Sequence, residues 1–212
     1  MDSLTAAEYT EDWTPISTAE LGWSTSCQVS ARFFQCTRRS VHKQSHGYFH
    51  ALLVAPSSQN FKANFNGVVF NNSHSASVGV IIRDRNGEVI EAKSKHIPLP
   101  NLVLEVEAMA CKRAVKFAYE FSIQEVIFEG DSLTVIQAIN NGGASEVPYD
   151  NIIDDIIVFA SHLSKAKFRH VKRTCNRLVD ALAKKAKNGD VFKAWIEDLP
   201  SNIAPLAIFD VH

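Results

Sequence analysis

Residues 61–70, with the sequence FKANFNGVVF, mark the point at which the character of the chain changes. From residue 62 they have the composition of a β-strand, and the apolar run 78–82 (VGVII) predicts a second one. Residues 84–87 (DRNG) form a tight-turn sequence, after which 88–95 alternates between apolar and polar residues. The sequence therefore predicts three antiparallel strands in succession.

Helical spacing begins after two prolines and extends over residues 103–121. One face of this predicted helix carries Val103, Glu107, Ala110, Cys111, Ala114 and Ala118, and the other Glu105, Lys112, Lys116 and Glu120. Further strands are expected at 125–128 and 167–171, and further helices at 132–139, 151–163 and 176–186. This order predicts an α/β fold, in which a five-stranded mixed sheet, an antiparallel meander continued by parallel strands, is flanked by helices.

Composition and periodicity predict the domain organisation. The chain has 212 residues, of which 46% are hydrophobic, enough for one domain with a loose extension, and its formal net charge is only −1. Residues 1–60 show no helical or alternating period, so we expect a largely disordered N-terminal extension and linker. The folded domain is expected at 61–190, followed by a C-terminal tail at 191–212.

The cysteines and the hydropathy pattern indicate an intracellular protein. Four scattered cysteines favour reduced thiols, and no apolar run approaches the roughly 20 residues that span a bilayer. A basic, apolar signal peptide is also not visible, and nucleus and cytoplasm both stay open. A zinc site is disfavoured because the C-x8-C spacing exceeds the usual 2 to 4 intervening residues. Its candidate ligands would be Cys27, Cys36, His42 and His46.

Four polar residues fall where this layout calls for apolar residues or strand ends. Glu107 lies on the helix face that should meet the sheet, although a shift in helix phase would leave it at a solvated edge. Asp131 follows a strand, where α/β sheets place ligands, but it also suits an N-cap. Asp180 on its own predicts only a solvated ion pair, and a lone histidine such as His170 is more often structural or exposed.

Asn66-Gly67 allows two interpretations. Asn-Gly between apolar residues is a type I′ hairpin signal, which would place Asn66 in a turn. Asn86-Gly87 serves better as the hairpin turn, and using both would leave the first strand too short to anchor a sheet. The second interpretation places Asn66 inside the strand.

Five spaced motifs together resemble RNase H-like domains. Residues 62–68 (KANFNGV) resemble the K-x-N-x-D-G-A opening of these domains, and 77–84 (SVGVIIRD) their second strand. Residues 107–110 (EAMA) match their A-E-A-x-A helix, 129–132 (EGDS) their x-x-D-S turn, and 170–183 (HVKRTCNRLVDALA) their H-V-x-R-x-x-N-x-x-x-D-x-L-A close. The resemblance is to the reverse-transcriptase-associated type that is abundant in plant genomes as retroelement-derived proteins.

The resemblance implies a ribonuclease that cleaves the RNA strand of an RNA–DNA hybrid. Two Mg²⁺ ions held by four carboxylates would activate a water for in-line attack. Carried over by motif, Glu107, Asp131 and Asp180 are metal ligands, and His170 assists proton transfer or product release. Nucleic-acid contacts are expected from Lys172, Arg173, Asn176 and Arg177.

Asn66 departs from the family pattern, because it occupies the position of the aspartate that bridges both ions. An amide offers one neutral oxygen and an NH₂ group that cannot ligate, so metal affinity and nucleophile activation should both fall. Nine bases face one acid over residues 165–187, either as a solvated face or as a phosphate-binding flank. The hypotheses are an impaired hybrid ribonuclease, a non-catalytic nucleic-acid-binding module and a retroelement remnant.

Overall fold

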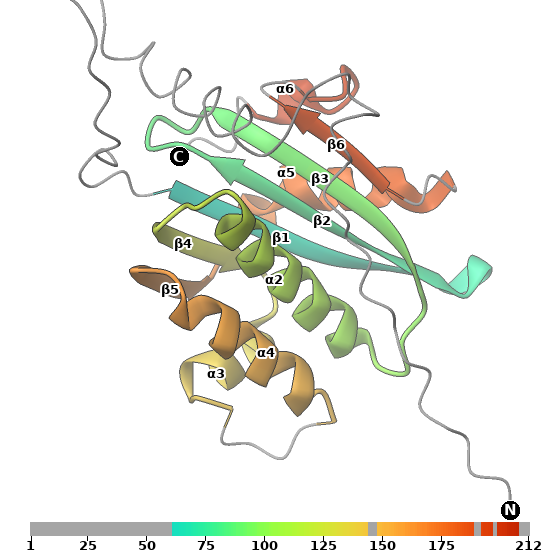
Figure 1. Ribbon diagram of the computed structural model, residues 1–212. Coiled ribbons are helices and arrows are strands. Elements are labelled where there is room, and N and C mark those ends of the chain that lie inside the picture. Colours follow the sequence, from blue (N-terminus) through green and yellow to red (C-terminus); the bar gives the residue numbers. More distant parts are fainter. Residues whose placement is uncertain (1–60, 144–147, 189–191, 197–198, 208–212) are drawn as a thin grey trace, which may run out of the picture. The chain divides into compact units, whose positions relative to one another are not determined.

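A computed structural model describes residues 61–143, 148–188, 192–196 and 199–207 (Figure 1). All of them belong to one compact unit, 48–212. Residues 1–60, for which disorder is expected, lie outside the described residues. They include the four candidate ligands of the disfavoured zinc site. Both described cysteines, Cys111 and Cys175, are free thiols, as expected. Every helix in the described ranges is too short or too polar to span a bilayer.

A mixed sheet with the strand order β5-β4-β1-β2-β3-β6 forms the centre of the domain. Its strands are β1 (Phe61–Phe70), β2 (Ser75–Arg83), β3 (Val89–Pro98), β4 (Glu125–Gly130), β5 (Lys165–His170) and β6 (Phe192–Ile196). The first three form the predicted antiparallel meander, and β4 and β5 continue in parallel from β1. The prediction of five strands was one short: β6, expected to be tail, pairs antiparallel with β3.

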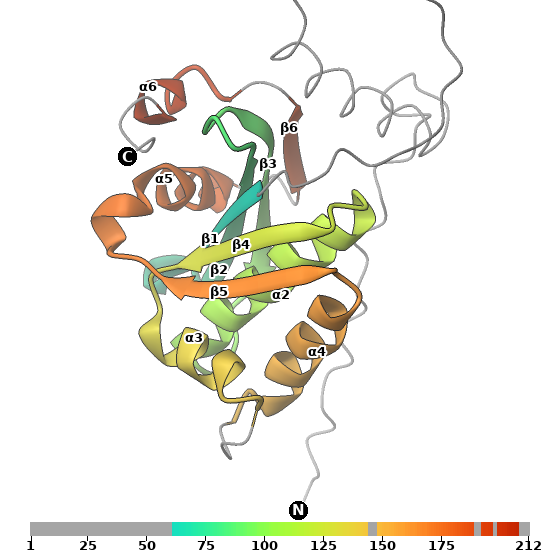
Figure 2. The same cartoon turned by 90° about the vertical axis from the view of Figure 1, so that its left-hand side faces the viewer.

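Helices cover both faces of the sheet. They are α2 (Val103–Glu120), α3 (Leu133–Asn140), α4 (Asp150–Ser161), α5 (Arg177–Lys185) and the short α6 (Ala204–Ala207). The first three lie against one face and α5 lies against the other, over β1, β2 and β3 (Figure 2). The described residues leave the α5-side face of β4 and β5 uncovered by any helix.

The core forms where strands meet helices on both faces. β2 is buried along its whole length, which explains its apolar run at 78–82. On the α5 side, Ile81 packs in one cluster with Leu178 and Leu182, all three with no exposed surface. Burying such a side chain contributes about 1.5–3 kcal/mol. This packing holds α5 firmly against the meander.

One prediction for the first helix was wrong, whereas the predicted turn is present. Val103, predicted to face the sheet, is 64% exposed because it begins the helix beyond the sheet contact. The turn predicted at 84–87 is present, with Gly87 at φ 82° and its N–H donating to the Asp84 carbonyl at 3.1 Å. The other Asn-Gly pair is not a turn, since Asn66 pairs with Gly79 in the middle of β1 and β2.

Gly67 allows α2 to approach β1 closely. A Cβ atom at this position would lie 2.8 Å from Val106 Cγ1 and 2.9 Å from the Val106 backbone. Only a residue without a side chain fits this contact. The contact brings Glu107, the next residue of α2, beside the middle of β1.

Candidate functional site

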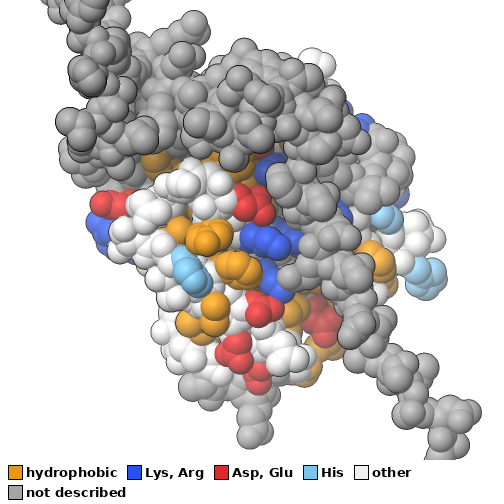
Figure 3. Space-filling view, in the orientation of Figure 1, with side chains coloured by type: hydrophobic (Ala, Val, Ile, Leu, Met, Phe, Trp, Pro, Cys, Tyr) orange, Lys and Arg blue, Asp and Glu red, His pale blue; other side chains and the backbone are white. Residues whose placement is uncertain are grey.

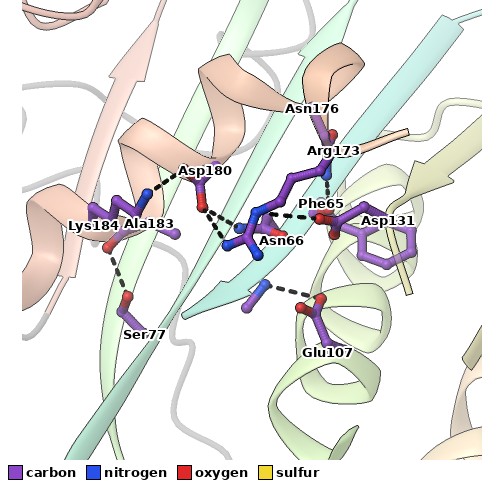
Figure 4. A network of polar contacts seen from close by, with 11 residues as sticks. Phe65, Asn66, Ser77, Glu107, Asp131, Arg173, Asn176, Asp180, Ala183 and Lys184 are labelled. Atoms are coloured by element: carbon purple, nitrogen blue, oxygen red, sulfur yellow. Dashed lines mark hydrogen bonds and ion pairs between the residues drawn. The ribbon is translucent and has the colours of Figure 1, made fainter. Parts of the chain in front are cut away.

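Four of the predicted site residues lie together, contributed by four different elements (Figure 4). Asn66 comes from β1, Glu107 from the first turns of α2, Asp131 from the end of β4 and Asp180 from α5. The amide Nδ2 of Asn66 donates a hydrogen bond to Asp180 Oδ1 at 3.1 Å. The site forms because β1 and β4 are parallel neighbours, while α2 and α5 approach them from opposite faces.

Asp180 is surrounded by hydrogen-bond donors and cations. Besides the Asn66 amide, Arg173 Nη2 lies 3.4 Å from its Oδ1, and Lys184 Nζ lies 2.5 Å from its Oδ2. The lysine stands one helical turn further along α5, at the i,i+4 spacing that brings side chains together. The negative charge of Asp180 is thereby balanced within the protein.

Glu107 lies in the opposite electrostatic environment. Its Oε2 accepts a hydrogen bond from the Gly67 N–H at 3.1 Å. Burial above all, together with the negative charges of Asp131 and Asp180, raises the pKa of Glu107 to about 8, although the Gly67 hydrogen bond and Arg173 act in the opposite direction. The Glu107 side of the site is therefore short of positive charge.

Two buried oxygens at the centre of the site have no hydrogen-bond partner among the described residues. They are Asn66 Oδ1 and Asp131 Oδ1. The other oxygen of Asp131, Oδ2, lies 3.9 Å from Arg173 Nε. Buried polar atoms in native proteins almost always have a partner, so the two free oxygens indicate room for a ligand or an ordered water.

The residues present do not fit a pair of divalent ions. In the part of the chain that the structure describes, no group of three His, Cys, Asp or Glu side chains is arranged to hold a metal. Two adjacent dications need several free carboxylates to offset their repulsion. Here Asn66 removes one carboxylate, and Asp180 is already paired with Arg173 and Lys184.

The other predicted residues divide into exposed and buried ones. His170 ends β5 and is exposed, as are Lys172 and Arg177. Asn176, predicted to contact nucleic acid, is only 1% exposed, and its Nδ2 donates to the Phe65 carbonyl at 2.9 Å. Its contact with nucleic acid stays a prediction, and in this structure Asn176 holds the start of α5 against β1.

Sequence analysis missed the double role of Arg173. Its guanidinium lies between Asp131 and Asp180, and its side chain is still 71% exposed. The sequence places this arginine before α5, but only the fold brings it beside the end of β4. Lys184 could have been found, since it follows Asp180 by four residues.

A second polar network on the same face of the sheet was also missed. Arg83 Nη1 donates to Asn64 Oδ1 at 3.3 Å, Asn64 Nδ2 donates to Glu129 Oε2 at 3.2 Å, and Lys62 Nζ lies 3.8 Å from Glu129 Oε1. The signal was the period of two along β1, which aligns Lys62, Asn64 and Asn66 on one face. The network makes the approach to the site polar.

The mixed sheet, the helices on its two faces and the position of the polar residues define an RNase H-like domain. The family model described as reverse transcriptase-like matches residues 64–186, more than half of the chain, and the chain belongs to this family. Its plant retroelement origin stays a prediction. No curated protein matches the chain.

Solved RNase H structures share the fold. RNase H1 from the halophilic archaeon Halobacterium salinarum NRC-1 is 22% identical, with a TM-score of 0.56, over 60% of this chain and 96% of that one. LC11-RNase H1, solved with an RNA/DNA hybrid, is 20% identical, with a TM-score of 0.54, over 59% and 95%. The prototype foamy virus protease-reverse transcriptase is 17% identical, with a TM-score of 0.52, over 66% and 22%. At these identities the likeness shows the fold alone.

Proposed function

We propose that the domain binds nucleic acid, preferably an RNA–DNA hybrid, and that Asn66 impairs hydrolysis of the RNA strand. One observation carries the proposal of impaired hydrolysis. The amide of Asn66, at the centre of the site, donates a hydrogen bond to Asp180 instead of offering a negative charge. A carboxylate at this position would repel Asp180 and would need a cation between the two. The site is therefore arranged to be stable without two metal ions.

The distribution of positive charge supports nucleic-acid binding on the α5 side. Over residues 165–187 nine bases face one acid, and the side chains of Lys167, Arg169, Lys172 and Arg177 are exposed. Lys167 and Arg169 belong to β5, on the sheet face that α5 leaves uncovered. Phosphates bind such surfaces by releasing counterions.

The opposite face of the domain does not have this character. Over α2 and α4 it shows hydrophobic, acidic and basic side chains intermixed (Figure 3). Tyr119 and Val158 are 47% and 56% exposed, and Lys112 is paired with Asp155 at 2.7 Å. The phosphate backbone is therefore expected on the α5 side, next to the site.

Hydrolysis requires more than the fold. In this family two Mg²⁺ ions would supply the Lewis acid and the activated water. This chain's residues bind and orient: Gly67 holds Glu107, Asn176 anchors the start of α5 to β1, and Arg173 bridges Asp131 and Asp180. The charge of Asp180 is already balanced by Arg173 and Lys184, so we expect little cleavage. In the limiting case the domain binds nucleic acid and does not cleave it.

Fluorescence anisotropy on labelled hybrid, duplex RNA and duplex DNA, with and without EDTA, tests the binding. A gel assay of the hybrid in Mg²⁺ and Mn²⁺ tests cleavage. We expect hybrid binding that persists in EDTA and weakens steeply with salt, and cleavage far slower than that of the Asn66→Asp variant. Absence of hybrid binding at low salt would refute the binding proposal, and rapid cleavage by freshly prepared wild type would refute the impairment.

A further inference from the structure

We propose that the sheet face of β4 and β5 that α5 leaves uncovered binds the phosphates of a single-stranded overhang that continues from a bound hybrid. The inference rests on the proposed function, because it extends nucleic-acid binding from the site onto β5. It names a feature of the substrate, an unpaired strand at the end of the hybrid. Affinity for a blunt hybrid and the additional effect of an overhang are measured separately, so failure of one proposal can be told from failure of the other.

A row of basic side chains lies along one face of β5. Lys165, Lys167 and Arg169 are all exposed. Phe168 points to the opposite face, where its ring stacks on that of the buried Phe128 with the centroids 5.1 Å apart. Because side chains alternate along a strand, the three bases project together from the α5 side of the sheet.

Two acids lie on the same face, but both are already engaged. They come from β4, the neighbour of β5 in the sheet. Glu125 Oε2 lies 3.4 Å from Lys165 Nζ, and Glu129 Oε1 lies 3.8 Å from Lys62 Nζ. Glu129 also accepts a hydrogen bond from Asn64 Nδ2 at 3.2 Å. The carboxylates are therefore held by residues other than the last two bases of the row.

Lys167 and Arg169 keep their positive charge for a ligand. In the register of β4 and β5, Lys167 lies beside the apolar Ile127, and Arg169 lies beside Glu129, whose carboxylate faces Lys62 instead. Neither base has an ion-pair partner in the described part of the chain. Unpaired bases that line one face attract an anion, and a polyanion most strongly.

The spacing of the row suits an extended nucleic-acid strand. Alternate side chains of a parallel strand stand about 6.6 Å apart, close to the separation of successive phosphates in an extended single strand. From Lys165 to Arg169 the row covers about 13 Å, enough for about three phosphates. A duplex turns its phosphates away along a helix, whereas an unpaired strand can follow β5. The overhang is therefore the part of the substrate that fits this face.

The row leads directly to the site. β4 and β5 are parallel and lie side by side, and the chain passes from the end of β5 to α5 (Figure 2). Asp131 follows the end of β4, and the Val171 N–H donates to the Gly130 carbonyl at 2.9 Å just beyond β5. Arg173 comes next, with its Nε 3.9 Å from Asp131 Oδ2. A strand that leaves the site can thus continue along β5 past basic side chains.

Fluorescence anisotropy compares a blunt hybrid with four hybrids that carry an overhang of about four nucleotides, at the 3′ or 5′ end of the RNA or the DNA strand. We expect at least one overhang to raise the affinity about tenfold at about 50 mM salt. Each phosphate contact on a single strand adds about −0.7 to the slope of log K against log salt, so two contacts steepen it by about 1.4. The advantage should then fall about sevenfold between about 50 and 200 mM salt.

Variants assign the overhang effect to the row. For each variant the overhang effect is its affinity for the overhang hybrid divided by its affinity for the blunt hybrid, with circular dichroism checking the fold. Lys167→Gln combined with Arg169→Gln should reduce this ratio to less than about twofold, whereas Lys167→Arg combined with Arg169→Lys should keep it. The matched control, Arg85→Gln combined with Lys116→Gln, removes two bases that lie outside β5 and should also keep it.

Three results would overturn the proposal. Equal affinity of the wild type for blunt and overhang hybrids would refute it and leave the proposed function standing. An overhang effect that survives in the folded glutamine variant of β5, or that is lost equally in the control, would place the contacts elsewhere. Absence of binding to every hybrid would refute the proposed function and this inference together.

Discussion

Replacing Asn66 with Asp is the most direct perturbation of the site. The change is nearly isosteric, but it removes the 3.1 Å hydrogen bond to Asp180 and sets two carboxylates against each other. A hydrogen bond to a charged group is worth about 1.5–3 kcal/mol. Two like charges at this distance repel by about 5 kcal/mol at an effective dielectric constant of 20, and we expect Arg173 and Lys184 to offset roughly half of that.

The expected result is a loss of about 4–5.5 kcal/mol in the free energy of unfolding at pH 8 in EDTA. Urea titrations followed by circular dichroism measure this loss. Mg²⁺ should recover much of it in Asn66→Asp, because an ion bound only by the folded state adds about 2.7 kcal/mol at one hundred times its dissociation constant. The wild type should gain less.

The same variant should gain Mg²⁺-dependent cleavage of the RNA strand in a hybrid, since it supplies the missing bridging charge. Combining it with Asp131→Asn should abolish that cleavage, and Ca²⁺ should support binding with little cleavage. Because Asn-Gly sequences deamidate, any wild-type activity has to be compared between fresh and stored protein. The reasoning is refuted if Asn66→Asp in EDTA is as stable as the wild type and Mg²⁺ does not stabilise it.

Three further substitutions test the surrounding elements. Because the pKa of Glu107 is raised to about 8, the folded state binds its proton more tightly, and stability should fall as the pH rises from 4.5 to 8. Urea unfolding across this range should show a shallower fall for Glu107→Gln. Gly67→Ala should lower the free energy of unfolding by about 2–3 kcal/mol in thermal or urea unfolding, because its Cβ would meet Val106. A loss below about 1 kcal/mol would mean that α2 shifts freely. Each phosphate contact contributes about −0.9 to the slope of log K against log salt. Replacing three bases with alanine should therefore flatten this slope for hybrid binding. The control, Arg85→Ala combined with Lys116→Ala, should leave the slope unchanged. The three bases are Lys172, Arg173 and Arg177.

The sequence was sufficient for the elements whose residues alternate or repeat with a clear period. β1, the turn at 84–87, α2 and β4 all lie within a few residues of their predicted positions, because local patterning decides them. β6 was missed because its short sequence carries no turn signal, and it is a strand only through its pairing with the edge of β3. Long-range pairing of this kind leaves no local pattern.

The candidate site, too, could be predicted from the sequence only in part. The convergence of Asn66 with the three carboxylates follows from motif order once the topology is known. The burial of Asn176 and the position of Arg173 depend on how the segment before α5 packs against the middle of β1 and the end of β4. A motif names the residue at such a position but does not say whether its side chain faces solvent or the sheet.

The effect expected of Asn66 on metal binding is larger than the loss of one ligand. An alanine at this position would only remove a carboxylate, whereas asparagine also supplies an N–H donor that binds Asp180. Arg173 and Lys184 pair with the same acid. One amide thus replaces the carboxylate that the family pattern places at position 66 and also engages a second carboxylate, Asp180. We therefore expect recovery of a two-ion site to require a negative charge at position 66, and alanine at this position would not suffice.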